Sequence, residues 1–429
     1  MSESTTPPGI TIIGSGYVGA VTGAGFAALG HPVWFVDTDP GKIQVIRHAS
    51  PPVYEQGLAE LFTDNKRRIH ATASLNEAVE RTEILMICVG TPPIEDGSQD
   101  TRQVGSAATA IGRALRQRSS WHTVVVKSTV LPGTTEKVII PFIEHESGRT
   151  AGKGFGIAVN PEFLQEGSAI RDFRDPDRIV IGTRDETSTR VMTDLYSSFA
   201  CPKVFVDLRT AEMVKFVNNA FLATKISFAN EMGNLCKREG IDTQDVFRAV
   251  GMDRRINPAF FRSGIGFGGS CLPKDVRALI NHAEELGIDH PILDAVVNTN
   301  ETQPEMMILL LKRHLPDLKG RNIGILGLSF KPGTDDIRES RAIPVIRRLL
   351  EEGARVTAYD PQAMAAFSKV IPGPDYAMSP QDVIGADAVL IITEWDEFNE
   401  LDYTGKIVVD GRRIEMARKT AEIYEGVCW

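Results

Sequence analysis

One cysteine of the chain stands in a setting that suits covalent chemistry. Cys271 ends the glycine-rich run that begins at Gly264, and Lys274 and Asp275 follow it at an expected helix start. A helix N-terminus and a nearby lysine both favour the thiolate, the form of cysteine that attacks carbon. Flexible glycines leave the backbone room to move, and Asp275 offers a carboxylate to manage protons. We therefore predict that Cys271 is a nucleophile, against the alternative of a buried structural cysteine.

A second candidate group lies on a long segment without proline. Glu212, Lys215 and Asn219 are separated by three and four residues, so a helix would project them from one face. Asn218 and Asn219 are costly inside a helix unless a partner uses the amides. Two interpretations remain open: a functional helix face with a cation and an amide, or a charged face that is only solvated.

The pattern G-x-G-x-x-G occurs at Gly14, Gly16 and Gly19, between the strand-like run ITII and a run of small residues. Such glycines allow a tight turn, let a pyrophosphate approach the backbone, and bring strand against helix. Asp37 ends the next strand-like run, where a carboxylate accepts from a ribose hydroxyl and repels a 2′-phosphate. The combination predicts an NAD site rather than an NADP site or a structural glycine turn.

Further polar groups follow other expected strands. Glu162 and Glu166 stand in a strand-to-helix connection, where open α/β sheets place ligand contacts, although a helix cap would also explain them. Cations occur near strand ends of the last part of the chain, and we interpret them as a cradle for a second phosphate group. They are Lys331, Arg338, Arg341, Arg412 and Arg413, of which Arg341 is expected on the solvated surface.

Strands and helices alternate in two regions, and both must position these groups. Strand-like runs over 10–13, 33–37, 84–89, 124–127, 157–159 and 179–181 predict a parallel, doubly wound sheet. Helical sequence then covers 210–238, 243–250, 275–286 and 292–312, and strand-like runs return at 322–326, 356–359, 388–392 and 407–409. We predict two Rossmann-like α/β domains, over 1–205 and 309–429, joined by a helical domain over 206–308 that contains one long helix. The run Gly324–Phe330 lacks the third glycine, so no dinucleotide is expected there.

Composition excludes several classes of protein. The 429 residues are 42% hydrophobic and 24% charged, which is typical of a folded globular chain of two to four domains. The net charge of −9 would repel a nucleic acid. No run approaches the ~18 apolar residues of a membrane span, and the first nine residues lack a basic, apolar leader pattern, so we expect a cytoplasmic protein. Five scattered cysteines without a C-x-x-C pair suggest neither disulfides nor a metal site.

Seven motifs in order resemble the UDP-glucose/GDP-mannose dehydrogenase family over essentially the whole chain. They are GSGYVG from Gly14, VGTPP from Val89, KSTV from Lys127, NPEFLQEGSAI from Asn160, AEMVKFVNNAFLATKISFANE from Ala211, GFGGSCLPKD from Gly266, and the pair GLSFKPGTDDIRES and DGRR. One departure is Gln56 in YEQGL, where the UDP-glucose group more often has proline.

The resemblance implies a four-electron oxidation of a nucleotide sugar, from C6 alcohol to carboxylate, with two NAD per sugar. It implies that Cys271 forms a thiohemiacetal and then a thioester that water hydrolyses. Lys215 would stabilise oxyanion character with Asn219, and Asp275 would work with a water. Glu162 and Thr129 would take part in acid–base or water-mediated steps.

The resemblance also implies which residues contact each ligand. The cofactor set is Gly14, Gly16, Tyr17, Val18, Gly19, Asp37, Lys42, Val89, Gly90, Thr91, Thr129, Glu166, Cys271, Lys274 and Arg338. The substrate set is Glu162, Phe163, Leu164, Glu166, Lys215, Asn219, Arg255, Phe260, Arg262, Gly264, Phe267, Gly268, Phe330, Lys331 and Arg412. A homodimer is implied, in which Arg255 reaches the neighbouring active site.

Alternatives remain for the substrate and for the class of protein. UDP-glucose is the favoured substrate, while CLPKDVRAL is also compatible with GDP-mannose, and the family includes enzymes for UDP-N-acetylhexosamines. A two-electron hydroxyacid or alcohol dehydrogenase would not need Cys271 or a second nucleotide-binding domain. An NAD-dependent sensor would be expected to lack a chemical residue, yet Cys271, Lys215, Asn219 and Asp275 are all present.

Overall fold

The computed structural model describes residues 7–429, which form two compact units that meet in the sequence between Val217 and Asn218. Residues 1–6, part of the N-terminal segment considered above, lie outside the described residues. Each unit contains a mainly parallel sheet, and a helical region follows the first one in the sequence, which confirms the predicted fold class.

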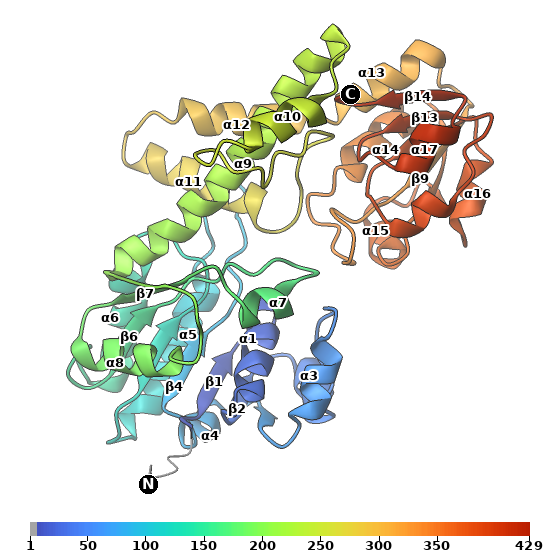
Figure 1. Ribbon diagram of the computed structural model, residues 1–429. Coiled ribbons are helices and arrows are strands. Elements are labelled where there is room, and N and C mark those ends of the chain that lie inside the picture. Colours follow the sequence, from blue (N-terminus) through green and yellow to red (C-terminus); the bar gives the residue numbers. More distant parts are fainter. Residues whose placement is uncertain (1–6) are drawn as a thin grey trace. The chain divides into compact units, whose positions relative to one another are not determined.

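The first unit is built on an eight-stranded sheet with the order β3-β2-β1-β4-β5-β6-β7-β8 (Figure 1). Its strands are β1 (Ile10–Ile13), β2 (Val33–Val36), β3 (Ile69–Thr72), β4 (Ile84–Ile87), β5 (Thr123–Val126), β6 (Gly156–Val159), β7 (Ile179–Thr183) and β8 (Lys203–Val206). Its helices are α1 (Tyr17–Ala28), α2 (Pro40–Arg47), α3 (Leu58–Asp64), α4 (Leu75–Val79), α5 (Arg102–Arg116), the π-helical turn η1 (Thr135–Ile139), α6 (Ile140–Ser147), α7 (Ala169–Arg174) and α8 (Glu186–Leu195).

Alternation along the central strands supplies two separate cores. Ile10 and Ile12 of β1 pack with α1, α3 and α7 on one face, whereas Ile13 packs with α5 and α6 on the other. Successive side chains of a strand point to opposite faces, so a strand covered on both sides must be apolar throughout. This explains why the central strands are nearly continuous apolar runs, with Thr11 of β1 hydrogen-bonded to Thr82, and why the sequence identifies them.

One pair of strands departs from the predicted parallel arrangement. Strands β6 and β7 are antiparallel, with Val159 opposite Gly182. The connection between them contains only the six-residue helix α7, which contacts α1. The chain therefore returns at the carboxyl end of β6 instead of crossing the sheet, because a parallel neighbour would need a longer crossover.

The long helix predicted over 210–238 is α9 (Leu208–Glu239), and helices continue after it. They are α10 (Thr243–Gly251), α11 (Leu272–Glu285), α12 (Pro291–Thr302) and α13 (Glu305–His314). The helical sequence predicted over 292–312 is confirmed as two helices, since Pro304 separates α12 from α13. Proline has no N–H for the carbonyl four residues earlier, that of Asn300, and Arg341 donates to this carbonyl instead at 3.4 Å.

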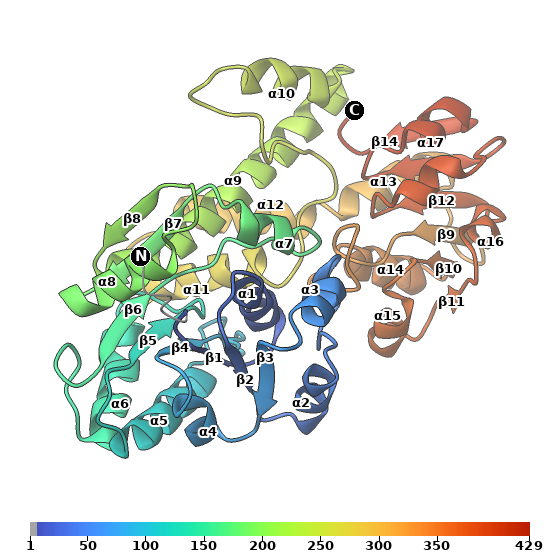
Figure 2. The same ribbon diagram turned by 60° about the horizontal axis from the view of Figure 1, so that its bottom comes forward.

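The second unit ends in a six-stranded parallel sheet with the order β11-β10-β9-β12-β13-β14 (Figure 2). Its strands are β9 (Asn322–Leu326), β10 (Arg355–Tyr359), β11 (Asp375–Tyr376), β12 (Ala388–Ile391), β13 (Ile407–Asp410) and β14 (Ile423–Gly426). The helices are α14 (Ala342–Glu351), α15 (Met364–Val370), α16 (Pro380–Ile384), the 3-10 turn η2 (Asp396–Glu400) and α17 (Glu415–Thr420). One core joins the sheet to α13, α14 and α15, and another joins it to α16, η2 and α17.

Four strands were not identified from the sequence, and all four are sheet edges. They are β3, β8, β11 and β14. An edge strand is covered less completely than a central one, so it needs fewer apolar residues; β8, for example, leaves Val204 and Phe205 exposed. The missed strands thus lack the apolar runs that identified the others.

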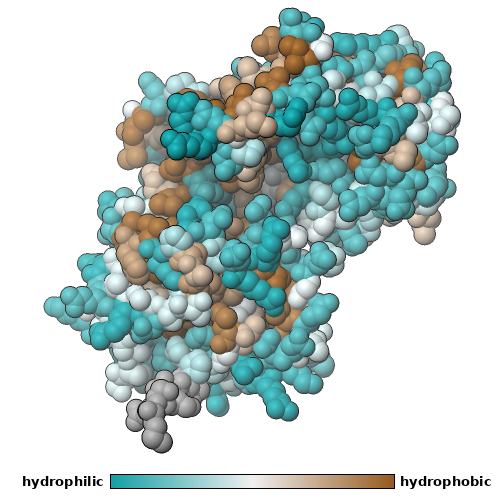
Figure 3. Space-filling view, in the orientation of Figure 1, coloured by the Kyte–Doolittle hydropathy of each residue, from teal (hydrophilic) through white to brown (hydrophobic). Residues whose placement is uncertain are grey.

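The helical part of the second unit exposes several apolar side chains among polar ones. Figure 3 shows hydrophobic patches over this region, and the exposed apolar residues of α9 include Phe221, Phe228 and Leu235. Their spacing of seven residues places them on one side of the helix. No helix among residues 7–429 combines the length and apolarity that crossing a bilayer requires.

Candidate active site

The predicted dinucleotide motif forms the turn between β1 and α1. Gly14 has a φ of +94°, a conformation that favours glycine. A Cβ at Gly19 would lie 2.0 Å from the Gly14 carbonyl oxygen, so glycine is required for strand and helix to approach. A Cβ at Gly16 would meet no atom within 4 Å, which leaves open space at the N-terminus of α1. An anion such as a pyrophosphate fits there, beside Tyr17 and Val18 in the first turn.

Asp37 follows β2 and its carboxylate faces the same turn. Its Oδ2 accepts from the Ser15 backbone N–H at 2.8 Å and from the Ser15 hydroxyl at 2.6 Å. Burial alone would raise the pKa of Asp37, but these hydrogen bonds, the Asp39 N–H and the charge of Lys42 together lower it. Lys42 lies 4.0 Å away. Asp37 is therefore an ionised acceptor that fits a ribose diol.

The loops after β4 and β5 are bound to each other. Thr91 Oγ1 donates to the Thr129 carbonyl at 2.9 Å, and the Ser128 hydroxyl donates to the Val89 carbonyl at 2.7 Å. Val89, Gly90, Thr91 and Thr129 thus belong to one pair of neighbouring loops at the carboxyl edge of the first sheet. This edge is where open α/β sheets bind ligands.

Two of the predicted catalytic residues pair inside the first unit. Lys215 of α9 lies 2.9 Å from Glu162, and both side chains are buried. Burial alone would raise the pKa of Glu162, but the ion pair with Lys215, the Leu164 N–H and the charge of Lys127 lower it. Phe163 lies beside this pair, with the Lys215 ammonium 5.4 Å from its ring centre. The geometry can hold a carboxylate and an ammonium in their charged forms.

A buried carboxylate that the sequence analysis missed holds the end of this loop. Glu55 accepts from the Tyr17 hydroxyl at 2.5 Å, from Gly167 N–H at 2.7 Å and from Ala169 N–H at 2.8 Å. It therefore ties the connection that contains Glu162, Leu164 and Glu166 to the first turn of α1. The neighbours of Glu55 in YEQGL, Tyr54 and Gln56, give no sign of partners so distant in the sequence.

Glu212, considered above with Lys215 and Asn219, has a structural partner. Its two oxygens accept from Gly133 N–H at 2.5 Å and Thr135 N–H at 2.9 Å. Burial outweighs these bonds and raises the pKa of Glu212. It therefore binds the loop before η1, so a role in chemistry is not needed to explain it.

In the second unit, the side chain of Asn219 has a partner, as expected of an amide inside a helix. That partner is Asp275. Asn219 Nδ2 donates to Asp275 Oδ2 at 2.6 Å, and Lys274 Nζ lies 2.5 Å from Asp275 Oδ1. Asp275 is buried, whereas Cys271 is exposed at the N-cap of α11. The N-terminal end of a helix stabilises a negative charge, so the position suits a thiolate. Lys274, expected to act on this thiol, is held by Asp275.

The glycines before Cys271 allow close packing, a role that the sequence did not indicate. A Cβ at Gly264 would lie 2.4 Å from the Gly411 carbonyl oxygen, and one at Gly268 would lie 2.3 Å from that of Glu339. The ring of Phe330 would be 2.8 Å from a Cβ at Gly269. The segment is therefore pressed against loops at the carboxyl edge of the second sheet.

Three amide side chains brace the same segment and were also missed. Asn230 accepts from Gly264 N–H at 2.8 Å, and Gln303 donates to the Gly264 carbonyl at 2.6 Å. Asn300 both accepts from Phe267 N–H at 2.7 Å and donates to its carbonyl at 3.0 Å. The rule applied to Asn219, that an amide inside a helix needs a partner, would also have indicated Asn230 and Asn300.

The cations of the second unit divide into two groups. Arg412 follows β13, donates to the Ile392 carbonyl at 2.7 Å and lies 3.4 Å from Glu394. Lys331 lies 5.5 Å from the Phe330 ring centre. Arg413 is bound by Asp242 through two hydrogen bonds. Arg412 and Lys331 thus follow β13 and β9 at the carboxyl edge of the second sheet, where open α/β sheets bind ligands.

Four further residues of the predicted sites lie on surface loops of this unit. Arg255 and Arg338 are exposed and pair with Asp253 and Asp336, each at 2.6 Å. Arg262 is exposed 3.6 Å from Glu394, and Phe260 has a positive φ of 67°.

The expectation that Arg341 lies on the surface is wrong. It is buried and donates to the carbonyls of Glu339 and Asn300, because Pro304 has freed the latter.

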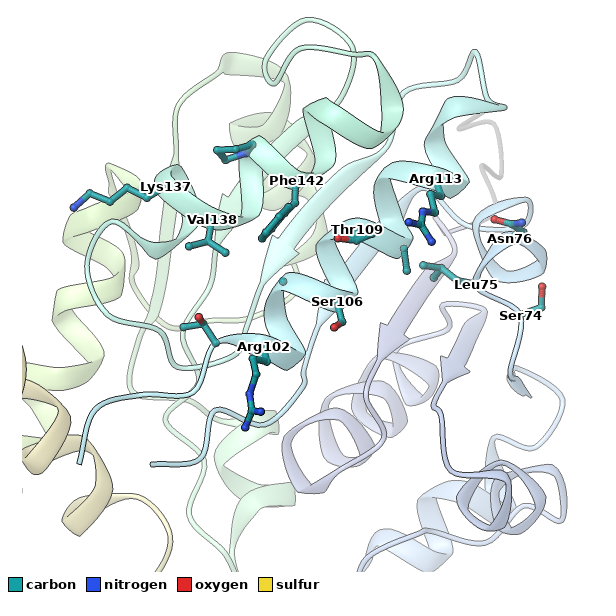
Figure 4. Close-up of a pocket in the computed structure, with 14 residues that line it drawn as sticks. Ser74, Leu75, Asn76, Arg102, Ser106, Thr109, Arg113, Lys137, Val138 and Phe142 are labelled. Atoms are coloured by element: carbon teal, nitrogen blue, oxygen red, sulfur yellow. The ribbon is translucent and has the colours of Figure 1, made fainter. Parts of the chain in front are cut away.

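A large open groove lies elsewhere on the first unit. It has a volume of about 1170 Å³ between α4, α5 and the segment η1–α6 (Figure 4). Two of its three lining cations, Arg102 and Arg113, pair with Asp100 and Glu146, and none of the predicted site residues lines it. Within residues 7–429 no cluster of three metal-binding side chains occurs.

Comparisons with known proteins agree with this arrangement. Models of the UDP-glucose/GDP-mannose dehydrogenase family match residues 9–200 as the NAD binding domain, 209–302 as the central domain and 324–416 as the UDP binding domain. The chain belongs to this family and is an NAD-dependent oxidoreductase of nucleotide sugars.

Individual relatives match over nearly their full length. The UDP-glucose 6-dehydrogenase AglM of Haloferax volcanii is 43% identical, covering 97% of this chain and 99% of the relative. The GDP-mannose 6-dehydrogenase of Azotobacter vinelandii is 38% identical, covering 98% and 100%. The solved UDP-glucose dehydrogenase of Pyrobaculum islandicum is 47% identical, with a TM-score of 0.96, covering 100% of this chain and 99% of that one.

Proposed function

We propose that the chain oxidises the C6 alcohol of UDP-glucose to a carboxylate, forming UDP-glucuronate with two NAD per sugar. The observation that carries this proposal is the exposed Cys271 at the N-cap of α11, one helical turn before the buried pair of Asp275 and Asn219. A two-electron dehydrogenase needs no such thiol, whereas oxidation beyond the aldehyde benefits from a covalent thioester.

The residues of the first unit fit NAD. Open space at Gly16 and the ionised Asp37 would hold the pyrophosphate and the adenine ribose. Val89, Gly90, Thr91 and Glu166 would lie toward the nicotinamide, and Lys274 and Arg338 complete the proposed cofactor set. When bound, NAD supplies a hydride acceptor for each of the two oxidations.

In the first oxidation the alcohol loses a hydride and a proton. Lys215 and Asn219 would stabilise the negative charge that develops on the C6 oxygen, a task that suits a cation and an amide. Glu162 and Thr129 would handle the proton, directly or through water. The buried ion pair of Glu162 with Lys215 supports this division, since it keeps both groups charged.

In the second oxidation the Cys271 thiolate would add to the C6 aldehyde and form a thiohemiacetal. Loss of a second hydride and a proton leaves a thioester. Water then attacks the thioester carbon, the carbon–sulfur bond breaks, and carboxylate and thiol are released. Asp275, which the chain holds through Asn219 and Lys274, would direct that water.

The sugar nucleotide would bind along the carboxyl edge of the second sheet. Gly264, Phe267, Gly268 and Phe330 meet there, with Lys331 and Arg412 as the cations for the diphosphate. Phe163, Leu164, Phe260 and Arg262 complete the proposed set. The match to a UDP binding domain supports UDP-glucose, while the similarity to a GDP-mannose 6-dehydrogenase keeps GDP-mannose as the second candidate.

The decisive test is the yield of NADH per sugar. With limiting UDP-glucose we expect two NADH per sugar consumed, and no comparable activity with GDP-mannose or UDP-N-acetylglucosamine. Cys271→Ser should lose complete oxidation yet still bind NAD. A yield of one NADH, or full turnover by the serine variant, would refute the thioester route.

We also propose a homodimer built around α9. The exposed residues Phe221, Phe228 and Leu235 support it, because apolar residues repeated every seven positions on a helix form a typical association surface. Arg255 would then reach the neighbouring active site. Light scattering should give twice the 47.0 kDa chain mass, and Phe228→Glu should halve it. A monomeric wild type would contradict this assembly.

A further inference from the structure

A buried lysine of the first unit has no part in the chemistry proposed above. Lys127 follows β5, and its side chain is only 6% exposed. Burying an ammonium group is costly unless partners compensate its charge. The partners that surround Lys127 therefore indicate what it does.

The ammonium group of Lys127 binds one residue twice. Nζ lies 3.0 Å from Asn160 Oδ1 and 3.4 Å from the Asn160 carbonyl oxygen. Lys127 and Asn160 stand directly after β5 and β6, whose last residues, Val126 and Val159, are paired in register. The two side chains thus meet at the carboxyl edge of the sheet.

Asn160 is fixed from its other sides as well. Its Nδ2 donates to the Val180 carbonyl at 2.8 Å, and its Oδ1 also accepts from the Tyr196 hydroxyl at 2.5 Å. Asn160 precedes Pro161 and Glu162, so its position determines where the Glu162 backbone begins. Lys127 therefore anchors the strand end that presents Glu162 to Lys215.

The charges in this buried region are unequal. The lysines Lys127 and Lys215 and the carboxylate of Glu162 are all buried here, and the charge of each lysine lowers the pKa of Glu162. The Cys88 thiol stays neutral, since burial raises its pKa to about 12, and burial raises the pKa of Tyr196 too. Arg178 adds a cation 4.1 Å from the Phe163 ring centre. Excess positive charge favours the ionised form of Glu162 and any oxyanion beside it.

We propose that Lys127 is a positioning residue of the oxidation, which anchors the Asn160–Glu162 segment and presents Glu162 as a carboxylate to Lys215. This inference rests on the proposed role of Glu162. In this proposal Lys127 contacts neither NAD nor the sugar nucleotide. It acts on the reaction only through the Asn160–Glu162 segment. Burial lowers the pKa of Lys127 while Glu162 raises it, so each group depends on the charge of the other.

The pH profile of kcat/KM for UDP-glucose tests this role. In the wild type the pKa of Glu162 is below its ordinary 4.5, so activity should stay level down to about pH 5. In Lys127→Met the carboxylate loses a nearby cation, and the acid limb should move up by about one pH unit. We expect kcat to fall roughly 10- to 100-fold and the sugar KM to change less than about threefold.

Two variants separate this role from a structural one. Lys203→Met also removes an ammonium that donates to a carbonyl, that of Phe199, but Lys203 stands on the edge strand β8, which β7 separates from β6, the strand that precedes Glu162. It should lower the melting temperature without moving the acid limb. Lys127→Arg keeps the charge and should restore the wild-type limb.

Other outcomes overturn the inference or the proposed function separately. A folded Lys127→Met enzyme with an unmoved limb, or an equal movement in Lys203→Met, would refute the role of Lys127. If Lys127→Met does not fold, Asn160→Asp decides the question, because its carboxylate should offset Lys127 and move the limb in the same direction; an unmoved limb would overturn the role. A wild type that oxidises no UDP-glucose would instead refute the proposed function.

Discussion

The two sheets of the molecule contain the same local arrangement used in two ways. In the first, Asp37 follows β2 and accepts from the backbone N–H and hydroxyl of Ser15. In the second, Asp360 follows β10 and accepts from the N–H and hydroxyl of Ser329. Gly14 and Gly327 have φ values of 94° and 95° at the corresponding turns.

The difference lies in how much of each carboxylate remains available. Asp360 is fully buried and also accepts from Leu328, Gln362 and Ala363 N–H and from the indole of Trp395. Asp37 keeps 11% side-chain exposure, and α1 begins directly after its turn. In the second sheet the next helix, α14, begins only at Ala342. A similar turn therefore suits a dinucleotide only where the carboxylate is reachable and a helix N-terminus follows.

Removal of each carboxylate should have the largest effect on the two sheets. Asp360→Ala should cost about 3 kcal/mol or more in unfolding free energy, since each buried donor left unpaired costs about 1–3 kcal/mol. Asp37→Ala should cost less stability but raise the NAD KM about 10- to 100-fold. Thermal unfolding and NAD titration measure both. Equal loss of stability in the two variants would contradict the distinction between a structural Asp360 and a ligand-binding Asp37.

The glycines of the first turn should separate packing from binding. Gly19→Ala places a Cβ 2.0 Å from a backbone oxygen, so we expect a loss of roughly 1–3 kcal/mol in stability. Gly16→Ala meets no protein atom and should leave stability within about 0.5 kcal/mol, while NAD binding weakens at least about tenfold. Calorimetry of both variants, with and without NAD, checks this. Unchanged NAD affinity in Gly16→Ala would remove the pyrophosphate from that space.

Titration should also distinguish the sheets. Burial raises the pKa of Asp410 to about 6 in the second sheet, whereas the pKa of Asp37 is lowered. The folded protein thus holds a proton on Asp410 that the unfolded chain releases near pH 4, and stability should fall by roughly 1–3 kcal/mol between pH 4 and 6. Asp37 acts oppositely, because its contribution is lost as the pH falls below 3.8. In Asp410→Asn the fall between pH 4 and 6 should disappear; its persistence in denaturant titrations would assign it elsewhere.

The smallest effects come from single donors. Trp395→Phe removes one hydrogen bond to Asp360 and should cost about 1–2 kcal/mol in stability. Ser15→Ala removes one to Asp37 and should change the NAD KM less than about threefold. If Ser15→Ala matched Asp37→Ala in its effect on NAD, the carboxylate would not be the ribose acceptor.

Local patterns predicted the parts of the site that depend on neighbours in the sequence. The turn at Gly14, the acceptor Asp37 and the helix cap at Cys271 each follow from residues within one strand or turn. A rule about helical amides indicated that Asn219 needs a partner, although it did not identify Asp275 as that partner. The apolar runs identified the central strands because those are covered on both faces.

Partners distant in the sequence explain what could not be predicted. Glu55 binds residues more than a hundred positions away, and Glu212 binds Gly133, so their own segments carry no sign of these roles. Arg341 looked like a surface cation because its partner, the carbonyl of Asn300, became available only through Pro304. The four edge strands were missed because partial exposure lets them include polar residues.

The close packing of Gly264–Gly269 has a consequence for mutational scanning. A Cβ at Gly264 or Gly268 would strike a backbone oxygen that cannot move aside. Every substitution at these two positions should therefore lose activity in a saturation library, although neither glycine has a side chain that could take part in the reaction. A ranking of residues by intolerance alone would place them beside Cys271, and would mistake a requirement for space for a requirement for chemistry.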